Sequence, residues 1–230
     1  MPVTEFAILP LTHPLTKENP SLPSTLIQKL KTARTVLETA SKHSFHYFQE
    51  VEDPSVIYII GKWDSPTTHG IFLPSPENQR LLEGLKDDVV MQHEDPGKKI
   101  SMWHLDTDVF IVPASKEELK AEENLKWVFT APVVSCNRHF VPKDKKDGFE
   151  KKFNEVRYLL EEFTKPYFVV GGWRIEKESE EKEEWVLFSG FESVEHHMEF
   201  AKTEGFAKYR ELVAFVDGFE VRHLRAIEDL

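Results

Sequence analysis

The sequence predicts an α+β protein made of two successive β-α-β-β-α-β units, the order of elements in a ferredoxin-like domain. Three observations predict this class. A block of the first half recurs in the second half, both halves share one order of predicted elements, and the central strands are apolar on both faces. With 230 residues, 40% of them hydrophobic, the chain is long enough for two domains with buried cores.

The repeat is clearest where a predicted strand leads into a predicted helix. Residues 60–69 align without a gap with residues 188–197, and each segment is typical of a strand, an aromatic residue, an acid, a serine and then a helix. In this register Trp63 matches Phe191. The offset is about 128 residues, which is the size of one ordinary domain.

The first half opens with an apolar strand and then a loop interrupted by prolines. Ser24 is a suitable N-cap for the helix that follows, whose apolar residues recur at three- and four-residue spacing. Runs of β-branched and aromatic residues predict the next strands. In order, the predicted elements are a strand at 3–9, a helix at 24–40, strands at 45–51 and 56–63, a helix after Ser65, and a strand at 102–105.

The second half repeats this order. Its predicted elements are a strand at 133–141, a helix at 149–163, a hairpin at 168–175 and 185–191, a helix after Ser193, and a strand at 221–224. The acidic run 176–184 joins the two hairpin strands. Such a run is typical of a solvated loop tip, so we do not interpret it as a binding site.

The central strand of each half is apolar on both faces, as in residues 56–60 and 185–188. Helices cover only one face of a ferredoxin-like sheet, so something else must cover the other. The simplest cover for each sheet is the other one, which predicts two domains packed sheet to sheet. The predicted boundaries are 1–106 and 132–230, with a linker at 107–131 that holds an extra edge strand and a short helix.

Composition excludes several classes of function. The formal net charge of −11 disfavours nucleic acid or an anionic membrane as the main partner, and we find no strong basic patch. The only cysteine, Cys136, cannot form an intramolecular disulfide, and no run approaches the length that spans a bilayer. Because the first residues also lack the pattern of a signal peptide, we expect a cytoplasmic protein.

Two segments each lead into a predicted helix that carries aromatic residues and histidine: Gly61-Lys62-Trp63-Asp64-Ser65 and Gly190-Phe191-Glu192-Ser193. In these segments the chain resembles the antibiotic biosynthesis monooxygenase family. The resemblance covers most of both halves. It implies ferredoxin-like domains that pair as a dimeric α/β barrel, formed here inside one chain. It also implies, as one activity of the family, oxidation of aromatic polyketides or quinols without metal or flavin.

Haem-degrading relatives use an asparagine on the first strand, a tryptophan at the end of the third strand and a histidine on the following helix. Here that set is divided between the halves. Asn137 stands in the second half, whereas the tryptophan, Trp63, stands in the first. At the histidine position the halves have Tyr209-Arg210 and Leu81-Leu82 instead. We therefore expect neither haem degradation nor any cofactor.

Oxygenation without a cofactor needs a group that helps to remove a proton from the substrate, and histidine has the side-chain pKa nearest neutrality. The catalytic candidates are Asn137, His69, His139 and His197. The alternative for each histidine is a hydrogen-bonded core or rim residue. His196 and His197 cannot share a metal, because adjacent helical residues point about 100° apart, and we expect no metal site.

The candidates for substrate binding are mostly aromatic residues and histidines at repeated positions. They are Trp63, Arg138, Trp173, Phe191, Tyr209, His223 and His104. Ordinary core packing is the alternative for the aromatic side chains. For Arg138, on a strand that should be largely buried, we favour an ion pair with a carboxylate over an anionic ligand.

The leading hypothesis is a cofactor-independent monooxygenase that acts on an aromatic, quinol or polyketide-type small molecule. Two alternatives stay open. One is a non-catalytic module, of the small-molecule-binding or stress-response kind, and the other is a cofactor-free lyase or isomerase. The expected partner is a small aromatic molecule, with pairing of the two domains inside the chain and a further homodimer as an option.

Overall fold

The computed structural model describes residues 1–110, 125–228 and 230. The chain divides into two compact units. Unit 1 comprises Met1–Asp108 and Leu224–Leu230, and unit 2 comprises Val109–His223. The predicted edge strand and helix of the linker fall mostly on residues 111–124, outside the described residues. The predicted domain boundaries therefore stay a prediction.

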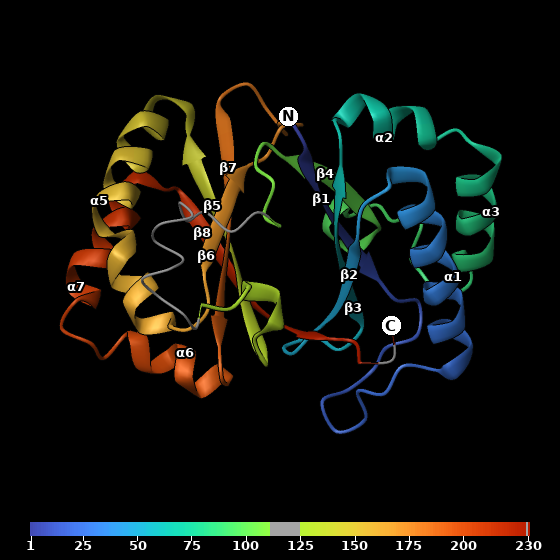
Figure 1. Cartoon of the computed structure of the whole chain (residues 1–230), viewed down its shortest axis with the longest axis horizontal. Helices are drawn as coiled ribbons and strands as arrows, with labels where there is room; N and C mark the ends of the chain where they lie inside the picture. Colours follow the sequence, from blue (N-terminus) through green and yellow to red (C-terminus); the bar gives the residue numbers. More distant parts are fainter. Residues whose placement is uncertain (111–124, 229) are drawn as a thin grey trace. The chain divides into compact units, whose positions relative to one another are not determined.

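Unit 1 contains an antiparallel four-stranded sheet with helices on one side (Figure 1). Its elements are β1 (Val3–Pro10), α1 (Ser24–Ser41), β2 (Phe45–Glu50), β3 (Val56–Trp63), α2 (Pro66–Phe72), α3 (Pro76–Leu85) and β4 (Ser101–Leu105). The strand order β4-β1-β3-β2 is that of a ferredoxin-like domain. The end of strand β8, at 224–226, pairs antiparallel with β2.

Unit 2 has the same order of elements. They are β5 (Val133–Pro142), α5 (Lys146–Thr164), β6 (Val169–Trp173), β7 (Lys182–Phe191), α6 (Val194–Phe200), α7 (Phe206–Tyr209), the 3-10 helix η4 (Arg210–Phe215) and β8 (Gly218–Ala226). The strand order here is β8-β5-β7-β6. The predicted α+β class, with a ferredoxin-like order in each half, is confirmed.

Each unit buries its helices against one face of its sheet. In unit 1, the buried residues of α1 recur at the three- and four-residue spacing seen in the sequence, and they include Leu26, Leu30, Ala33 and Leu37. Phe153 and Leu160 of α5 fill the same role in unit 2. The apolar periodicity therefore encodes the helical layer of both units.

The repeated serine is a helix cap. The Ser65 hydroxyl accepts a hydrogen bond from the backbone N–H of Thr68 at the start of α2, and Ser193 does the same for His196 in α6. Such a cap stabilises a helix by about 1 kcal/mol. Part of the motif on which the resemblance depends therefore has a structural role.

Strand register shows which positions of the two units correspond. Val3 lies opposite Trp63 in the β1–β3 pair, and Val133 lies opposite Phe191 in the β5–β7 pair. Counting along the two first strands from these residues, the equivalent positions are Glu5 and Ser135, Ala7 and Asn137, and Leu9 and His139. Unit 1 thus has alanine where unit 2 has the candidate catalytic asparagine.

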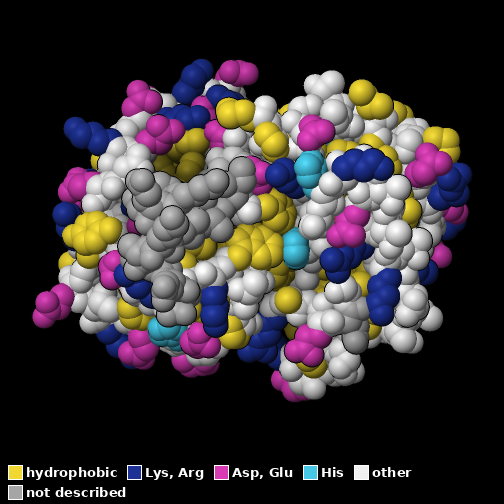
Figure 2. Space-filling view, in the orientation of Figure 1, with side chains coloured by type: hydrophobic (Ala, Val, Ile, Leu, Met, Phe, Trp, Pro, Cys, Tyr) yellow, Lys and Arg dark blue, Asp and Glu magenta, His cyan; other side chains and the backbone are white. Residues whose placement is uncertain are grey.

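The surface carries charges of both signs. On the face shown in Figure 2, Lys and Arg side chains of the described residues are interspersed with Asp and Glu rather than gathered into one patch. Among the described residues, none of the helices combines the length and the hydropathy that a bilayer-spanning helix needs.

Candidate functional site

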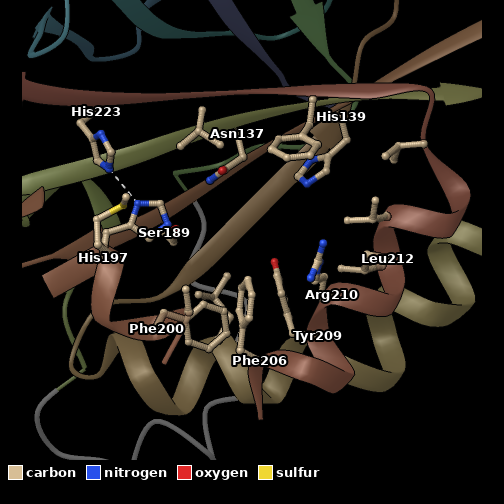
Figure 3. A pocket seen from close by; sticks show the side chains of 17 residues that line it. Asn137, His139, Ser189, His197, Phe200, Phe206, Tyr209, Arg210, Leu212 and His223 are labelled. Carbon is tan, nitrogen blue, oxygen red and sulfur yellow. Dashed lines mark hydrogen bonds between the residues drawn. The ribbon is translucent and has the colours of Figure 1, made fainter. Parts of the chain in front are cut away.

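Unit 2 contains a cavity of about 400 Å³. It lies between the helical side of the sheet and the segment that runs from α6 to η4 (Figure 3). Its lining residues are Asn137, His139, Leu160, Ser189, His197, Met198, Phe200, Ala201, Phe206, Tyr209, Arg210, Leu212, Val213, Val216, Phe219, Val221 and His223. The volume and the mainly apolar lining are typical of a site for a small organic molecule.

The apolar wall is buried on one side of the cavity and exposed on another. Phe200 and Leu212 are only 4% and 3% exposed, so they form a dry inner surface. Met198, Val213 and Phe219 are exposed side chains that also line the cavity. The cavity therefore combines a dry wall with an apolar mouth, which suits a largely apolar ligand.

Asn137 and His139 reach the cavity because residues two apart on a strand share one face. The Asn137 amide donates a hydrogen bond from Nδ2 to Ser135 Oγ, at 3.0 Å. No described residue donates to its Oδ1, so that oxygen is available to a ligand hydroxyl. The sheet thus presents an amide acceptor to the cavity.

His139 is a neutral polar group in this site. Burial lowers the pKa of its imidazole to about 4, because the charged form is poorly solvated there. Among the described residues, its Nδ1 atom is buried and has no hydrogen-bond partner. A ring that is uncharged at neutral pH serves better as a hydrogen-bonding group than as the proton acceptor.

His197 and His223 form a hydrogen-bonded pair at the edge of the cavity. His197 Nδ1 lies 2.7 Å from His223 Nε2, so one ring donates and the other accepts (Figure 3). The Phe191 ring stacks on His197, with ring centroids 4.4 Å apart and planes at 24°. Such a pair can take up one proton from a ligand and pass it between two imidazoles.

Tyr209 and Arg210 come from the junction of α7 and η4. In Figure 3 both side chains project toward the cavity, opposite Asn137 and His139 on the sheet. Burial raises the pKa of the Tyr209 phenol well above its usual range, so the hydroxyl stays protonated and can donate a hydrogen bond. Polar groups therefore face the cavity from the sheet and from the helical segment.

Unit 1 holds an equivalent histidine pair inside a buried cluster. His69 Nδ1 lies 2.9 Å from His104 Nε2, and the Trp63 ring stacks on His69 with centroids 4.3 Å apart and planes at 5°. All three side chains are buried and none lines the cavity of unit 2. The two histidine positions that recur in the sequence are thus partners within each unit.

Glu5 completes the unit 1 cluster, and the sequence analysis did not identify it. Trp63 donates from Nε1 to Glu5 Oε2 at 2.5 Å, and the same oxygen lies 3.5 Å from His69 Nδ1. Burial raises the pKa of this carboxyl to about 7, against the lowering effect of the Trp63 hydrogen bond and of His104. In the sequence, the signal that could have identified Glu5 was a single acidic residue in a strand of mostly apolar residues.

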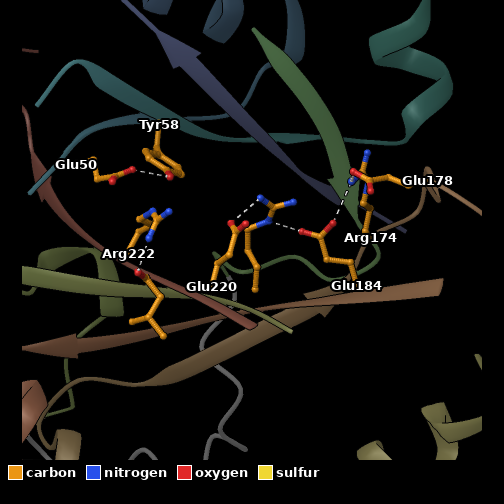
Figure 4. Close-up of polar contacts among 9 residues, drawn as sticks. Glu50, Tyr58, Arg174, Glu178, Glu184, Glu220 and Arg222 are labelled. Carbon is orange, nitrogen blue, oxygen red and sulfur yellow. Dashed lines mark hydrogen bonds and ion pairs between the residues drawn. The ribbon is translucent and has the colours of Figure 1, made fainter. Parts of the chain in front are cut away.

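Other predicted site residues lie outside the cavity. Arg138 faces the opposite side of β5 and forms ion pairs with Glu184 at 2.6 Å and Glu220 at 3.0 Å, so the structure shows the ion pair that we favoured. Figure 4 labels these two glutamates. Trp173 is buried and donates from Nε1 to Glu150 at 2.7 Å. Arg138 and Trp173 stabilise the fold and do not line the cavity.

The cavity also contains residues that sequence reasoning did not select. Ser189 and Arg210 are the polar ones, and the apolar wall comes from α6, α7 and η4. Ser189 could have been found as a small polar residue in an apolar strand. Arg210 stood beside Tyr209 in the sequence, but only the helical geometry shows that both side chains reach one space.

Solved structures of other proteins share this fold. A proposed monooxygenase from Lactobacillus acidophilus NCFM matches with a TM-score of 0.58 at 10% identity, over 100% of this chain and 94% of that chain. Another from Fusobacterium nucleatum subsp. nucleatum gives 0.61 at 8%, over 98% and 92%. An anthrone oxidase-like protein gives 0.59 at 8%, over 98% and 91%.

No family model matches the chain, and no curated protein matches it. At identities of 8–10% the structural matches show the fold alone. The resemblance to the antibiotic biosynthesis monooxygenases is thereby confirmed for the fold. Any function has to be argued from the cavity of unit 2.

Proposed function

We propose that unit 2 is a cofactor-independent monooxygenase that oxidises an aromatic hydroxy compound, such as an anthrone or a quinol. The observation that carries the proposal is the cavity of about 400 Å³, in which Asn137, Tyr209 and the His197–His223 pair surround an apolar interior. The fold shared with proposed monooxygenases and an anthrone oxidase-like protein supports it. The expected absence of a cofactor stays part of the proposal.

The reaction needs no external reductant. A base removes a proton from an anthrone-type substrate, and the resulting carbanion gives one electron to O₂. The substrate radical and superoxide then combine, and the peroxide that forms takes up a proton and loses water to leave a carbonyl group. One oxygen atom enters the product and the other enters water, while the CH₂ group supplies both electron pairs.

The side chains of the cavity divide these tasks. The His197–His223 pair takes the proton, because two hydrogen-bonded imidazoles can accept it and later return it to the peroxide. The Asn137 amide binds the substrate hydroxyl through Oδ1. Tyr209, kept protonated by burial, donates to the oxyanion that develops. The neutral His139 contributes a hydrogen bond.

Oxygen uptake by the metal-free protein, with a panel of anthrones, quinols and polyphenols, tests the proposal. Asn137→Ala and His197→Ala should each lower the rate about tenfold or more, since each removes a group that acts in proton transfer or oxyanion binding. Asn154→Ala and His93→Ala are matched controls, because Asn154 and His93 are exposed and lie outside the cavity. Both controls should keep the wild-type rate.

The outcomes separate this function from the alternatives. Uptake that survives both cavity variants, or that is absent with every substrate, contradicts the monooxygenase. Tight binding without turnover favours the non-catalytic binding module, which the mainly apolar lining and exposed apolar mouth would also suit. Conversion of substrate without oxygen consumption favours a lyase or isomerase.

A further inference from the structure

Arg210 gives the cavity of unit 2 a single fixed charge. Among the lining residues, all in the described part of the chain, it is the only Lys, Arg, Asp or Glu side chain. It begins η4, directly after Tyr209, and both side chains project toward the cavity (Figure 3). An apolar cavity with one positive charge at its exposed side favours an apolar ligand that carries a negative group at one end.

Among residues 1–110 and 125–228, no acidic side chain forms an ion pair with Arg210, although the chain has a net charge of −11. The acidic side chain next to it is engaged elsewhere, because Glu211 pairs with Lys152 at 2.9 Å. Lys208, on the same helical segment, has Glu155 as its partner at 3.4 Å. Arg210 therefore differs from the neighbouring cations.

The described residues that line the cavity with Arg210 do not supply an anion. Tyr209 stays a neutral phenol and His139 a neutral imidazole, for the reasons given above. A guanidinium presents paired N–H donors that match a carboxylate in a bidentate contact. The ligand itself is thus the natural source of the missing negative charge.

We propose that Arg210 selects aromatic substrates that carry a carboxylate, binding this group at the cavity mouth while the rings occupy the apolar interior. The inference rests on the proposed function for the aromatic part of the ligand. The carboxylate lies away from the reacting carbon and serves to orient it. Arg210 is therefore a specificity-determining residue.

A matched pair of unreactive ligands tests the inference by binding alone. Anthraquinone-2-carboxylate and its neutral carboxamide have the same rings, and calorimetry at low salt measures both affinities. Wild-type protein should bind the carboxylate about tenfold or more tightly, as charge-assisted hydrogen bonds allow. Arg210→Gln should abolish the preference, whereas Lys208→Gln, which removes a nearby charge outside the lining, should keep it.

Each outcome has one meaning. Equal affinity of wild-type protein for both ligands overturns the inference and leaves the aromatic site intact. A carboxylate preference that persists in Arg210→Gln overturns it as well. Binding of neither ligand contradicts the proposed function together with the inference. The binding measurement does not depend on oxygen uptake. A protein that lacks monooxygenase activity but still prefers the carboxylate would therefore support the role of Arg210 and contradict the proposed activity.

Discussion

Replacing Glu5 by glutamine should stabilise the chain at alkaline pH and have little effect at acid pH. Glu5 is only 5% exposed, and burial raises the pKa of its carboxyl to about 7 from an ordinary value of 4.5. The folded chain therefore holds this proton more tightly than the unfolded chain. Stability from the protonated form is fully present below pH 4.5 and is lost as the pH rises through 7.

The magnitude follows from the separation of the two pKa values. At 1.36 kcal/mol per pH unit, the interval from 4.5 to about 7 corresponds to about 3 kcal/mol of unfolding free energy. Glutamine cannot ionise, and its amide oxygen can still accept the hydrogen bond from Trp63 Nε1. The stabilisation by Glu5→Gln should thus grow by about 3 kcal/mol between pH 4.5 and pH 8.

Urea denaturation followed by circular dichroism, at pH 5 and at pH 8, measures this difference. Glu94→Gln is the control, because Glu94 is an exposed acid of the same unit. The control should change the unfolding free energy equally at both pH values. A gain for Glu5→Gln that is the same at pH 5 and pH 8, or larger at pH 5, refutes the burial argument.

Two further predictions concern unit 2. Arg138→Met should cost about 2 kcal/mol of unfolding free energy in urea, because it removes a mostly buried partner of Glu184, which keeps Arg174 at 2.9 Å. Arg157→Met is the control and should cost under about 1 kcal/mol, because the side chains of the Arg157–Glu161 pair are more exposed, at 34% and 35%. Equal losses would contradict the reasoning. The His139 imidazole should stay neutral down to about pH 5 in a nitrogen NMR titration. The unfolding free energy should therefore fall as the pH drops from 6.5 toward 4. A pKa of 6.5 or above would contradict the burial of this imidazole.

The elements of the fold were predictable because local patterns encode them. The helix predicted at 24–40 is α1 at Ser24–Ser41, and the strand predicted at 56–63 is β3. The second helix of unit 1 is interrupted, since Pro74 and Pro76 end α2 and start α3. That break was readable in the sequence, although the prediction did not include it.

The site was predictable only in part. Asn137 was selected because its place on the first strand of the second half matches the family resemblance, and His69 and His197 were selected because they recur at one repeat position. Three features of the site depend on how α6, α7 and η4 fold over the sheet. They are the hydrogen bond between His197 and His223, the burial that keeps His139 neutral near neutral pH, and the position of Arg210 opposite Asn137. Such contacts between elements distant in the sequence leave no periodic signal.

The last strand of the chain has a practical consequence for dissecting the protein. His223 belongs to unit 2, yet Leu224–Ala226 of the same strand pairs with β2 of unit 1. A fragment that ends after residue 108 would leave the β2 edge without this partner and open to aggregation. Unit 1 thus comprises Met1–Asp108 together with Leu224–Leu230. If the two halves were expressed separately, unit 1 would lack the strand residues that pair with β2.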